Sequence, residues 1–323
     1  MAVLRYDGHV HLVGNGQGGN GCWLRLDGLW HRALGEVMRR TIGLEAKVSA
    51  PDFDERFVAH LAGLIADSSL DAALLLAQDE VYDETGRKLD FGSFYVPNDY
   101  LFKVCAENQE FVPAVSIHPG RKDALEELER CLASGARALK LLPNCQNVNC
   151  ALPQYDEFWR RMAASGLPFL CHTGGEMTVP VINRSYQDPR ILRRPLELGV
   201  KVIAAHASGN SHFFDPNYFG ELIKLMDEFP QMYADTSALN SPIRSGVLKQ
   251  VKESGRLDRF LHGSDYPVPV GAFWVRLRGL ITHAQWREAG KIPNLIERDA
   301  FLKRAMGFDE RHFTRLGEIL RPL

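Results

Sequence analysis

Long hydrophobic runs, an excess of charge of one sign and a dense set of cysteines are all missing from this sequence. No apolar stretch approaches the roughly 18 residues that a membrane-spanning helix needs, and no basic segment is followed by an apolar signal core. The six cysteines are scattered, and Cys145 and Cys150, the closest pair, have no matching Cys or His pair at zinc-finger spacing. We therefore expect a cytoplasmic protein with reduced thiols and no membrane partner.

The charges of the two signs nearly cancel. The chain carries 38 Lys and Arg against 40 Asp and Glu, for a formal net charge of −2. Such a balance provides no strong positive field for nucleic acid or an anionic membrane. With 45% hydrophobic residues the composition is ordinary for a globular protein, which excludes disorder, collagen and coiled coil. The expected partner is a small-molecule substrate, and a homo-oligomer stays open.

Short apolar runs alternate with longer amphipathic stretches along the chain. Eight runs are typical of strands: 3–6, 71–77, 111–117, 136–142, 168–171, 200–205, 232–234 and 260–261. Helix-like stretches lie between them at 121–134, 154–165, 189–198, 217–229 and 243–254. This alternation indicates parallel βαβ units, and eight of them predict an α/β fold of the (β/α)8 TIM-barrel class. No linker or repeat divides the chain, so we expect one domain over residues 1–323.

Two regions exceed a minimal βα unit. Residues 12–70 separate the first two strands, which predicts an elaborated first βα loop over the strand ends. The tail after Tyr266 holds an apolar segment around Phe273 and Trp274, and then a helix over 295–306, which predicts a C-terminal helical extension. Either region could line or cover a pocket.

A glycine-rich segment in the first loop offers one competing interpretation. Residues 14–19 read GNGQGG and match the dinucleotide pattern G-x-G-x-x-G after a strand. That pattern requires a helix to follow at once, whereas here residues 20–23 read NGCW. We therefore interpret the segment as a flexible loop beside a metal, since it directly follows His11, a candidate metal ligand.

His9 and His11 provide the first sign of chemistry. Side chains two residues apart on an extended backbone point the same way, so both can reach one metal ion. Alone the pair is a weak signal, because short motifs also occur by chance.

Three further strand ends carry candidate ligands. His172 and His206 each end an apolar run, and Asp265 lies just beyond the last one. Singly, each is explained as well by a hydrogen-bonded histidine or a turn cap. Active sites of such barrels are assembled at the C-terminal strand ends, where imidazoles and a carboxylate suit Zn²⁺, and also Mn²⁺ or Fe²⁺. Together they predict a divalent metal, zinc first, with one or two ions per chain.

Lys140 lies in the middle of an apolar strand, between Leu139 and Leu141. Such a setting disfavours the ammonium ion and lowers the pKa of the side chain. Two interpretations stay open. The neutral amine could be carbamylated and bridge two metals, or the buried stem could carry a charged tip to an anionic substrate.

With these residues noted, the chain resembles the amidohydrolase superfamily, and looks most like its amidohydrolase-related branch of metal-dependent TIM-barrel hydrolases and decarboxylases. The matching features are His9-Val10-His11, Lys140, His172-Thr173-Gly174, His206 and the segment 263–267, which reads GSDYP. Residues 98–100 followed by 111–115 are also similar to the segment before the third strand of that branch. The resemblance covers residues 3 to about 267.

The resemblance implies roles for these side chains. His9, His11, His172 and Asp265 would hold a metal, while His206 would bind a second metal or act on substrate. Lys140 would be a carbamate ligand only in binuclear variants. The tail departs from the branch, which shows an Asn-Ala pair where residues 298–302 read RDAFL.

We expect metal-assisted hydrolysis of a C–O or C–N bond, in a lactone, ester or amide of a small, carboxylated molecule. Asp265 would take a proton from water and pass it to the leaving group, and His206 would stabilise the oxyanion or assist proton transfer. The residues expected to contact substrate follow strand ends and are Arg121, Asn144, Arg184, Asn210 and Tyr266.

Two other functions remain open at this stage. One is non-oxidative, metal-dependent decarboxylation of an aromatic or muconate-type acid at the same site. The other is a catalytically silent binding barrel without stoichiometric metal. Lys140 favours hydrolysis, because a lysine that can form a carbamate has no obvious duty in decarboxylation.

Overall fold

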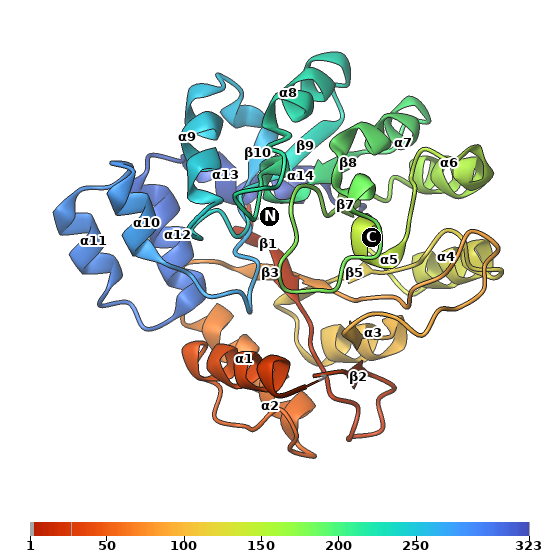
Figure 1. Cartoon of the computed structure of the whole chain (residues 1–323), viewed down its shortest axis with the longest axis horizontal. Helices are drawn as coiled ribbons and strands as arrows, with labels where there is room; N and C mark the ends of the chain where they lie inside the picture. The colour runs from red at the N-terminus through yellow and green to blue at the C-terminus, as the bar shows by residue number, and fades with distance from the viewer. Residues whose placement is uncertain (1–2, 27, 323) are drawn as a thin grey trace.

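Eight parallel strands form the centre of the molecule. The computed structural model describes residues 3–26 and 28–322, apart from the side chains of residues 30, 31 and 34. The sheet order is β1-β3-β5-β6-β7-β8-β9-β10, and the strands curve into a nearly closed TIM barrel surrounded by helices (Figure 1). The strands are β1 (Tyr6–His11), β3 (Ala72–Leu76), β5 (Phe111–Val115), β6 (Ala138–Leu141), β7 (Phe169–Cys171), β8 (Val202–Ala204), β9 (Met232–Asp235) and β10 (Phe260–Leu261).

The barrel closes between its first strand and the segment that follows its last. The Gly8 N–H donates to the His262 carbonyl at 3.0 Å, and the His11 N–H donates to the Tyr266 carbonyl at 2.8 Å. These bonds continue the ladder beyond β10, which is only two residues long. The residue stretch that carries Asp265 is thereby fixed against the histidines of β1.

The predicted barrel is confirmed, and only the first strand was misplaced. It was expected over residues 3–6, but β1 runs over Tyr6–His11. The strand carries Asp7, His9 and His11, so it lacks the apolar run by which the others were recognised. Buried polar side chains replaced hydrophobic ones here because they build the site.

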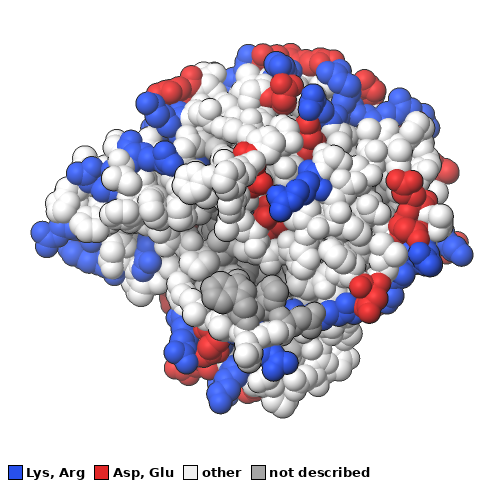
Figure 2. Space-filling view, viewed as in Figure 1, with Lys and Arg blue, Asp and Glu red and all other residues white. Residues whose placement is uncertain are grey.

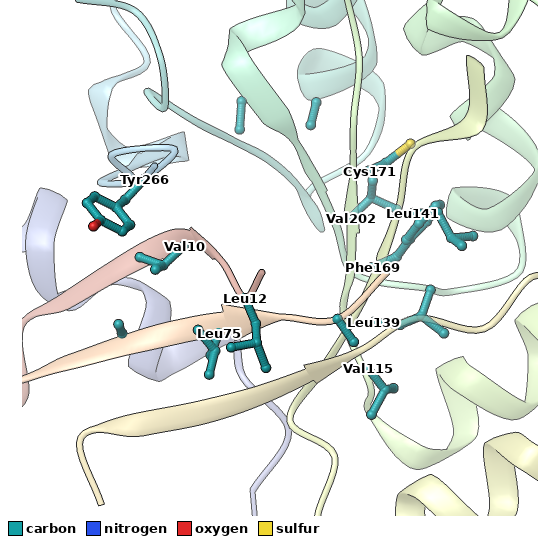
Figure 3. Close-up of a cluster of buried hydrophobic side chains, with 14 of the residues drawn as sticks. Val10, Leu12, Leu75, Val115, Leu139, Leu141, Phe169, Cys171, Val202 and Tyr266 are labelled. Atoms are coloured by element: carbon teal, nitrogen blue, oxygen red, sulfur yellow. The ribbon is translucent and has the colours of Figure 1, made fainter. Parts of the chain in front are cut away.

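Alternate side chains of each strand face opposite sides, which produces two separate apolar layers. Figure 3 shows the outer layer, between strands and helices, with side chains such as Val10, Leu75 and Phe169. The inner layer fills the barrel with residues that include Leu74, Leu170 and Ile203. Because Leu139 belongs to the outer layer and Ala138 to the inner one, Lys140 faces the barrel interior.

The predicted helical stretches each contain a shorter helix, and in the stretch 189–198 a 3-10 turn over Pro189–Leu192 precedes the five-residue α7 (Arg193–Glu197). The helices between strands are α2 (Phe53–Ala66), α3 (Asn98–Glu107), α4 (Ala124–Ala133), α6 (Asp156–Ser165), α7 (Arg193–Glu197), α8 (Phe219–Glu228) and α9 (Ser245–Glu253). A one-turn helix, α5 (Pro143–Gln146), directly follows β6.

The first βα loop is elaborated as expected. It contains β2 (Trp23–Leu24), α1 (Gly28–Thr41) and α2. The sequence did not reveal that β2 pairs in antiparallel fashion with β4 (Phe94–Tyr95), which lies in the next βα unit. The glycine-rich segment is folded around Asp54, whose carboxylate accepts the Asn15 and Gly16 N–H groups at 2.6 and 3.1 Å, and no helix follows it directly.

The last helices of the C-terminal extension close the barrel at the N-terminal ends of its strands. The extension consists of α10 (Ala272–Leu277), α11 (His283–Ala289), α12 (Leu295–Ala305), α13 (Glu310–Thr314) and α14 (Leu316–Ile319). Leu316, Ile319 and Leu320 pack into the inner apolar layer. The Arg315 guanidinium donates to the Phe260 carbonyl at 2.6 Å and fixes the extension to β10. The barrel floor is therefore apolar and sealed.

Replacing Leu316 by alanine is expected to lower the free energy of unfolding by about 2–5 kcal/mol, because it leaves a cavity in the inner layer. Urea unfolding followed by circular dichroism measures this change. Leu277→Ala is the matched control, since Leu277 is 67% exposed and its loss is expected to cost under about 0.5 kcal/mol. Equal effects of the two changes would contradict a packed floor.

Figure 2 shows no large region of one charge sign on the face that it draws. Basic and acidic side chains are mixed around its edge, and a few of both signs lie near the middle. Within the described part of the chain, no helix is long and apolar enough to cross a membrane.

Candidate active site

The chemically active side chains gather at the C-terminal ends of the strands. His9 and His11 end β1, Lys140 lies in β6, and Asp235 ends β9. His172 follows β7 by one residue, His206 follows β8 by two, and Asp265 comes shortly after β10. Because all strands are parallel, these residues lie at one end of the barrel, opposite the floor.

Asp265 lies between the two histidines of β1. Its Oδ1 atom is 3.2 Å from His9 Nε2 and 3.4 Å from His11 Nε2. His9, His206 and Asp265 each offer one ligand atom, and these atoms lie within 4.8 Å of one another. The predicted convergence of β1 with the end of β10 is therefore present.

The remaining two histidines lie beside this group. His172 Nδ1 and His206 Nε2 are 3.1 Å apart. His206 Nδ1 is 2.8 Å from the Ser237 hydroxyl and 3.1 Å from the Ser237 carbonyl, so this nitrogen carries the proton and Nε2 presents a lone pair. His172 Nδ1–H then donates to that lone pair.

His172 Nε2 faces the cavity side with its own lone pair. This buried nitrogen has no hydrogen-bond partner among the described residues, and the Glu176 Oε2 atom lies 3.5 Å away. Two acceptors so close together require a proton or a cation between them. The side chain is thus poised to bind a positively charged group.

Left-handed backbone conformations aim two of these side chains. His206 has φ 58° and Asp265 has φ 70°, a region that residues other than glycine seldom adopt. The Asp235 carboxylate accepts the His206 N–H at 2.8 Å, and the His9 carbonyl accepts the Asp265 N–H at 2.9 Å. Such conformations persist only where the surroundings hold them, and they cluster at functional sites.

Asp235 is a functional residue that the sequence analysis missed. Its carboxylate accepts a hydrogen bond from His9 Nδ1 at 2.7 Å, besides the bond from the His206 N–H. This bond places the His9 proton on Nδ1 and turns the Nε2 lone pair toward the site. The signal was present, because an acid ends the strand, but the predicted run stopped at Ala234.

Burial and neighbouring charges set the protonation states. Burial lowers the pKa of His9, of His206 and of His172, the last to about 3, so all three imidazoles are neutral. Burial raises the pKa of Asp265, but its contacts with His9 and His11 and the nearby charge of Arg244 outweigh that effect and hold the pKa well below the usual value. The site therefore combines neutral nitrogen donors with ionised carboxylates.

This donor set fits a divalent cation. Neutral imidazole and carboxylate are the ligands that Zn²⁺ and similar ions take in open, catalytic sites. His9, His206 and Asp265 form the closest group, His11 contacts the same carboxylate oxygen, and His172 has a buried lone pair with no partner among the described residues. The ligand set predicted from the sequence, with His11 and His172 in place of His206, stays a prediction.

Lys140 lies at the centre of the site. Its Nζ is 3.1 Å from His9 Nε2, and the residue is fully buried. Burial lowers the pKa of this amine, although the nearby carboxylates of Asp235 and Asp265 raise it. Nζ thus lies among the candidate ligand atoms, where both a carbamate and an ammonium group stay predictions.

A cavity of about 550 Å³ opens above these residues. Its polar end is formed by His11, His172, Glu176, His206 and Asp265. The other walls come from the β2–β4 strand pair, α1, α2, the loop after β7 and the segment after Asp265. The elaborated first loop therefore covers the site as the sequence predicts.

The five residues expected to contact substrate do not line this cavity. Arg121 is paired with Asp79 and Asp123 at 3.1 and 2.8 Å. The Asn210 amide donates to the His212 carbonyl, Arg184 is exposed beside Asp215, and Asn144 and Tyr266 are buried. A role for any of them in binding substrate stays a prediction.

Glu176 and Arg244 form a second part of the site that the sequence did not reveal. The Glu176 Oε1 atom accepts the Thr178 N–H at 2.5 Å and the Thr178 hydroxyl at 2.6 Å. Burial raises the pKa of Glu176, but the attraction of His172 and Arg244 outweighs it, so the carboxyl is ionised. Arg244 is buried and donates to the Gly175 carbonyl. Both residues lie outside the predicted strand ends and resembled ordinary surface charges in the sequence.

Comparisons with known proteins point the same way as the geometry. Residues 6–289 match the family model described as amidohydrolase. No sequence among the curated proteins matches the chain.

Several solved structures share the fold at low sequence identity. An uncharacterized TIM-barrel protein from Bordetella bronchiseptica is 18% identical with a TM-score of 0.59, over 97% of this chain and 99% of that one. A probable 2-pyrone-4,6-dicarboxylic acid hydrolase from Acinetobacter baumannii is 14% identical with a TM-score of 0.53, over 94% and 99%. A 5-carboxyvanillate decarboxylase from Sphingomonas paucimobilis is 12% identical with a TM-score of 0.53, over 97% and 99%. At these identities the likeness concerns the fold alone.

Proposed function

The chain belongs to the amidohydrolase family, and from that premise we propose that it is a metal-dependent hydrolase of a C–O or C–N bond, in a lactone, an ester or an amide. One observation carries the proposal. An ionised, buried carboxylate, that of Asp265, lies within hydrogen-bonding range of two imidazoles at the inner end of a cavity large enough for a small molecule.

His9, His206 and Asp265, with His11 and His172 beside them, are the residues that would hold the ion. When bound, a divalent cation supplies a Lewis acid that lowers the pKa of water and polarises a carbonyl. Asp235 and Ser237 keep the imidazole protons on Nδ1 of His9 and His206. Both Nε2 atoms therefore present lone pairs, which an ion would take over from Lys140 Nζ and the His172 Nδ1–H group, each 3.1 Å away.

Asp265 is the proposed proton carrier. Its carboxylate lies next to the candidate ligand atoms, where it can accept a proton from the attacking water as the new C–O bond forms. It then delivers that proton to the departing oxygen or nitrogen when the scissile bond breaks. The hydroxyl group of the water thereby ends on the acyl carbon, and its proton ends on the departing alcohol or amine.

His206 is proposed to be a ligand or a proton acceptor. Its Nδ1–H is held by Ser237, so Nε2 offers a lone pair and no hydrogen for an oxyanion. We therefore favour proton transfer over oxyanion stabilisation for this residue. Lys140 Nζ lies 3.1 Å from His9 Nε2. We take this lysine to favour hydrolysis, because a lysine that can form a carbamate has no obvious duty in decarboxylation.

Elemental analysis of the purified protein is expected to show one or two divalent ions per chain, with zinc as the main one. Removing them with a chelator is expected to abolish hydrolysis in a screen of lactones, esters and amides, and Zn²⁺ is expected to restore it. Because both reactions belong to the family's range, the same screen includes aromatic acids with a CO₂ detector. Release of CO₂ without hydrolysis would overturn the proposal in favour of decarboxylation. Protein without metal, in which His172→Ala leaves ligand binding unchanged, would indicate a silent barrel.

A further inference from the structure

The cavity has two chemically different halves. Next to the polar end, its walls are built from aliphatic and aromatic side chains of the first βα loop and of β4, the strand that pairs with it. They include Leu24, Met38, Ile42, Phe53, Phe57 and Phe94. Val179 and Pro180 of the loop after β7, with Pro267 and Val268 after Asp265, complete the wall. A bound molecule would therefore exchange water for apolar contact along most of its length.

The cationic side chains described in the lining are already paired. Arg39 donates to both Glu36 carboxylate oxygens, at 2.8 and 2.7 Å, and to the Leu44 carbonyl. Arg25 lies 2.6 Å from an Asp90 oxygen, with its guanidinium 4.4 Å from the centre of the Trp23 ring. A carboxylate on the substrate would have to compete with these partners for the guanidinium groups.

The apolar walls offer a carboxylate no charged partner besides Arg25 and Arg39 among the described lining residues. The two acidic side chains of the lining, Glu176 and Asp265, lie at the polar end. A carboxylate on the body of the substrate would therefore be buried against aliphatic and aromatic side chains, and an unpaired buried charge is strongly disfavoured. The expectation of a carboxylated substrate therefore finds no support in the described walls.

We propose that the substrate is an uncharged carboxylic ester or lactone whose acyl part carries a hydrophobic chain. The inference rests on the proposed function for its reacting group, and on the walls of the cavity for its apolar body. The scissile carbonyl lies at the polar end beside Asp265, and the chain extends between Met38, Ile42 and Phe94. Met38 and its neighbours on α1 thus determine specificity.

Two sets of ligands test the proposal separately from the reaction. The first is a series of 4-nitrophenyl esters from acetate to octanoate, compared with an octanoate ester that carries a terminal carboxylate. We expect kcat/KM to rise about threefold to fourfold for each added methylene group, as burial of an apolar CH₂ implies. The charged ester is expected to react at least about tenfold more slowly than its neutral counterpart.

The second set consists of methyl ketones of the same chain lengths, which cannot be hydrolysed. Their binding to the metal-loaded protein is measured by calorimetry and is expected to tighten by the same factor for each methylene group. If esters are not hydrolysed but ketones bind with this dependence, the proposed function fails and the inferred apolar specificity stands. If binding does not depend on chain length, or the charged analogue binds more tightly, the inference is overturned.

Met38→Glu is the variant that probes the wall. We expect it to weaken binding of the longest ketone at least about tenfold and to flatten the dependence on chain length, because it places a charge in the apolar half. Val37→Glu is the matched control on the same helix, since Val37 is 59% exposed and does not line the cavity, and it is expected to change nothing. Thermal melting checks that both variants are folded. If Met38→Glu does not fold, the dependence of binding on chain length in the wild-type protein still tests the inferred apolar specificity.

Discussion

Replacing Asp265 by asparagine is expected to reduce kcat/KM by about 10³-fold, within the range that general acid–base groups contribute. The amide keeps the shape of the side chain and cannot take up the proton of the attacking water. It also weakens the attraction that now joins this side chain to His9 and His11 at 3.2 and 3.4 Å. Activity is therefore expected to stay low even when excess Zn²⁺ restores the metal content.

The measurement combines steady-state kinetics with elemental analysis of each preparation. Asp258→Asn is the matched control, because its side chain is 73% exposed in its contact with Arg259 and lies away from the cavity. We expect that variant to retain full activity and metal. Activity of Asp265→Asn within about threefold of the unmodified protein would contradict the proton-carrying role.

Asp235→Asn is expected to lower the affinity for Zn²⁺ by about 10–100-fold, as is typical when the partner of a metal-binding histidine is lost. The asparagine amide can present hydrogens to His9 Nδ1 and so move the imidazole proton to Nε2, where it blocks the lone pair. It also weakens the support for the left-handed His206, whose N–H now donates to Asp235 at 2.8 Å.

A zinc-binding competition with a coloured chelator measures this loss directly, without any substrate. NMR of the histidine ring protons follows the change of tautomer. Asp227→Asn serves as control, because Asp227 is about half exposed and its contact is with Arg256 on the surface. An unchanged affinity for Zn²⁺ would show that Asp235 is only a structural residue.

The fold was predictable because its signal is spread over the whole chain. Seven strands are apolar runs that face helices on one side and the barrel interior on the other, so their hydrophobicity is visible in the sequence. The exception is β1, which carries Asp7, His9 and His11, and whose two histidines belong to the site. The place where the pattern fails is the place where the chemistry lies.

The candidate site was predictable only where it coincides with strand ends. That rule found His172, His206 and Asp265, and it would have found Asp235 had the predicted strand been one residue longer. It could not find Glu176 or Arg244, because their positions depend on how the loops after β7 and β9 fold. The same rule also selected Arg121, which the structure pairs with Asp79 and Asp123.

The side chains proposed to carry out the reaction and the side chains proposed to determine substrate specificity come from different parts of this chain. The former lie on the barrel strands or within a few residues of their ends. Much of the apolar wall belongs instead to the insertion of residues 12–70, which contributes Met38 of α1 and the adjacent Ile42. Substitutions in that insertion can alter which molecules enter without disturbing the ligands beneath. Substitutions during evolution can therefore change the substrate specificity of such a barrel while its reaction stays the same.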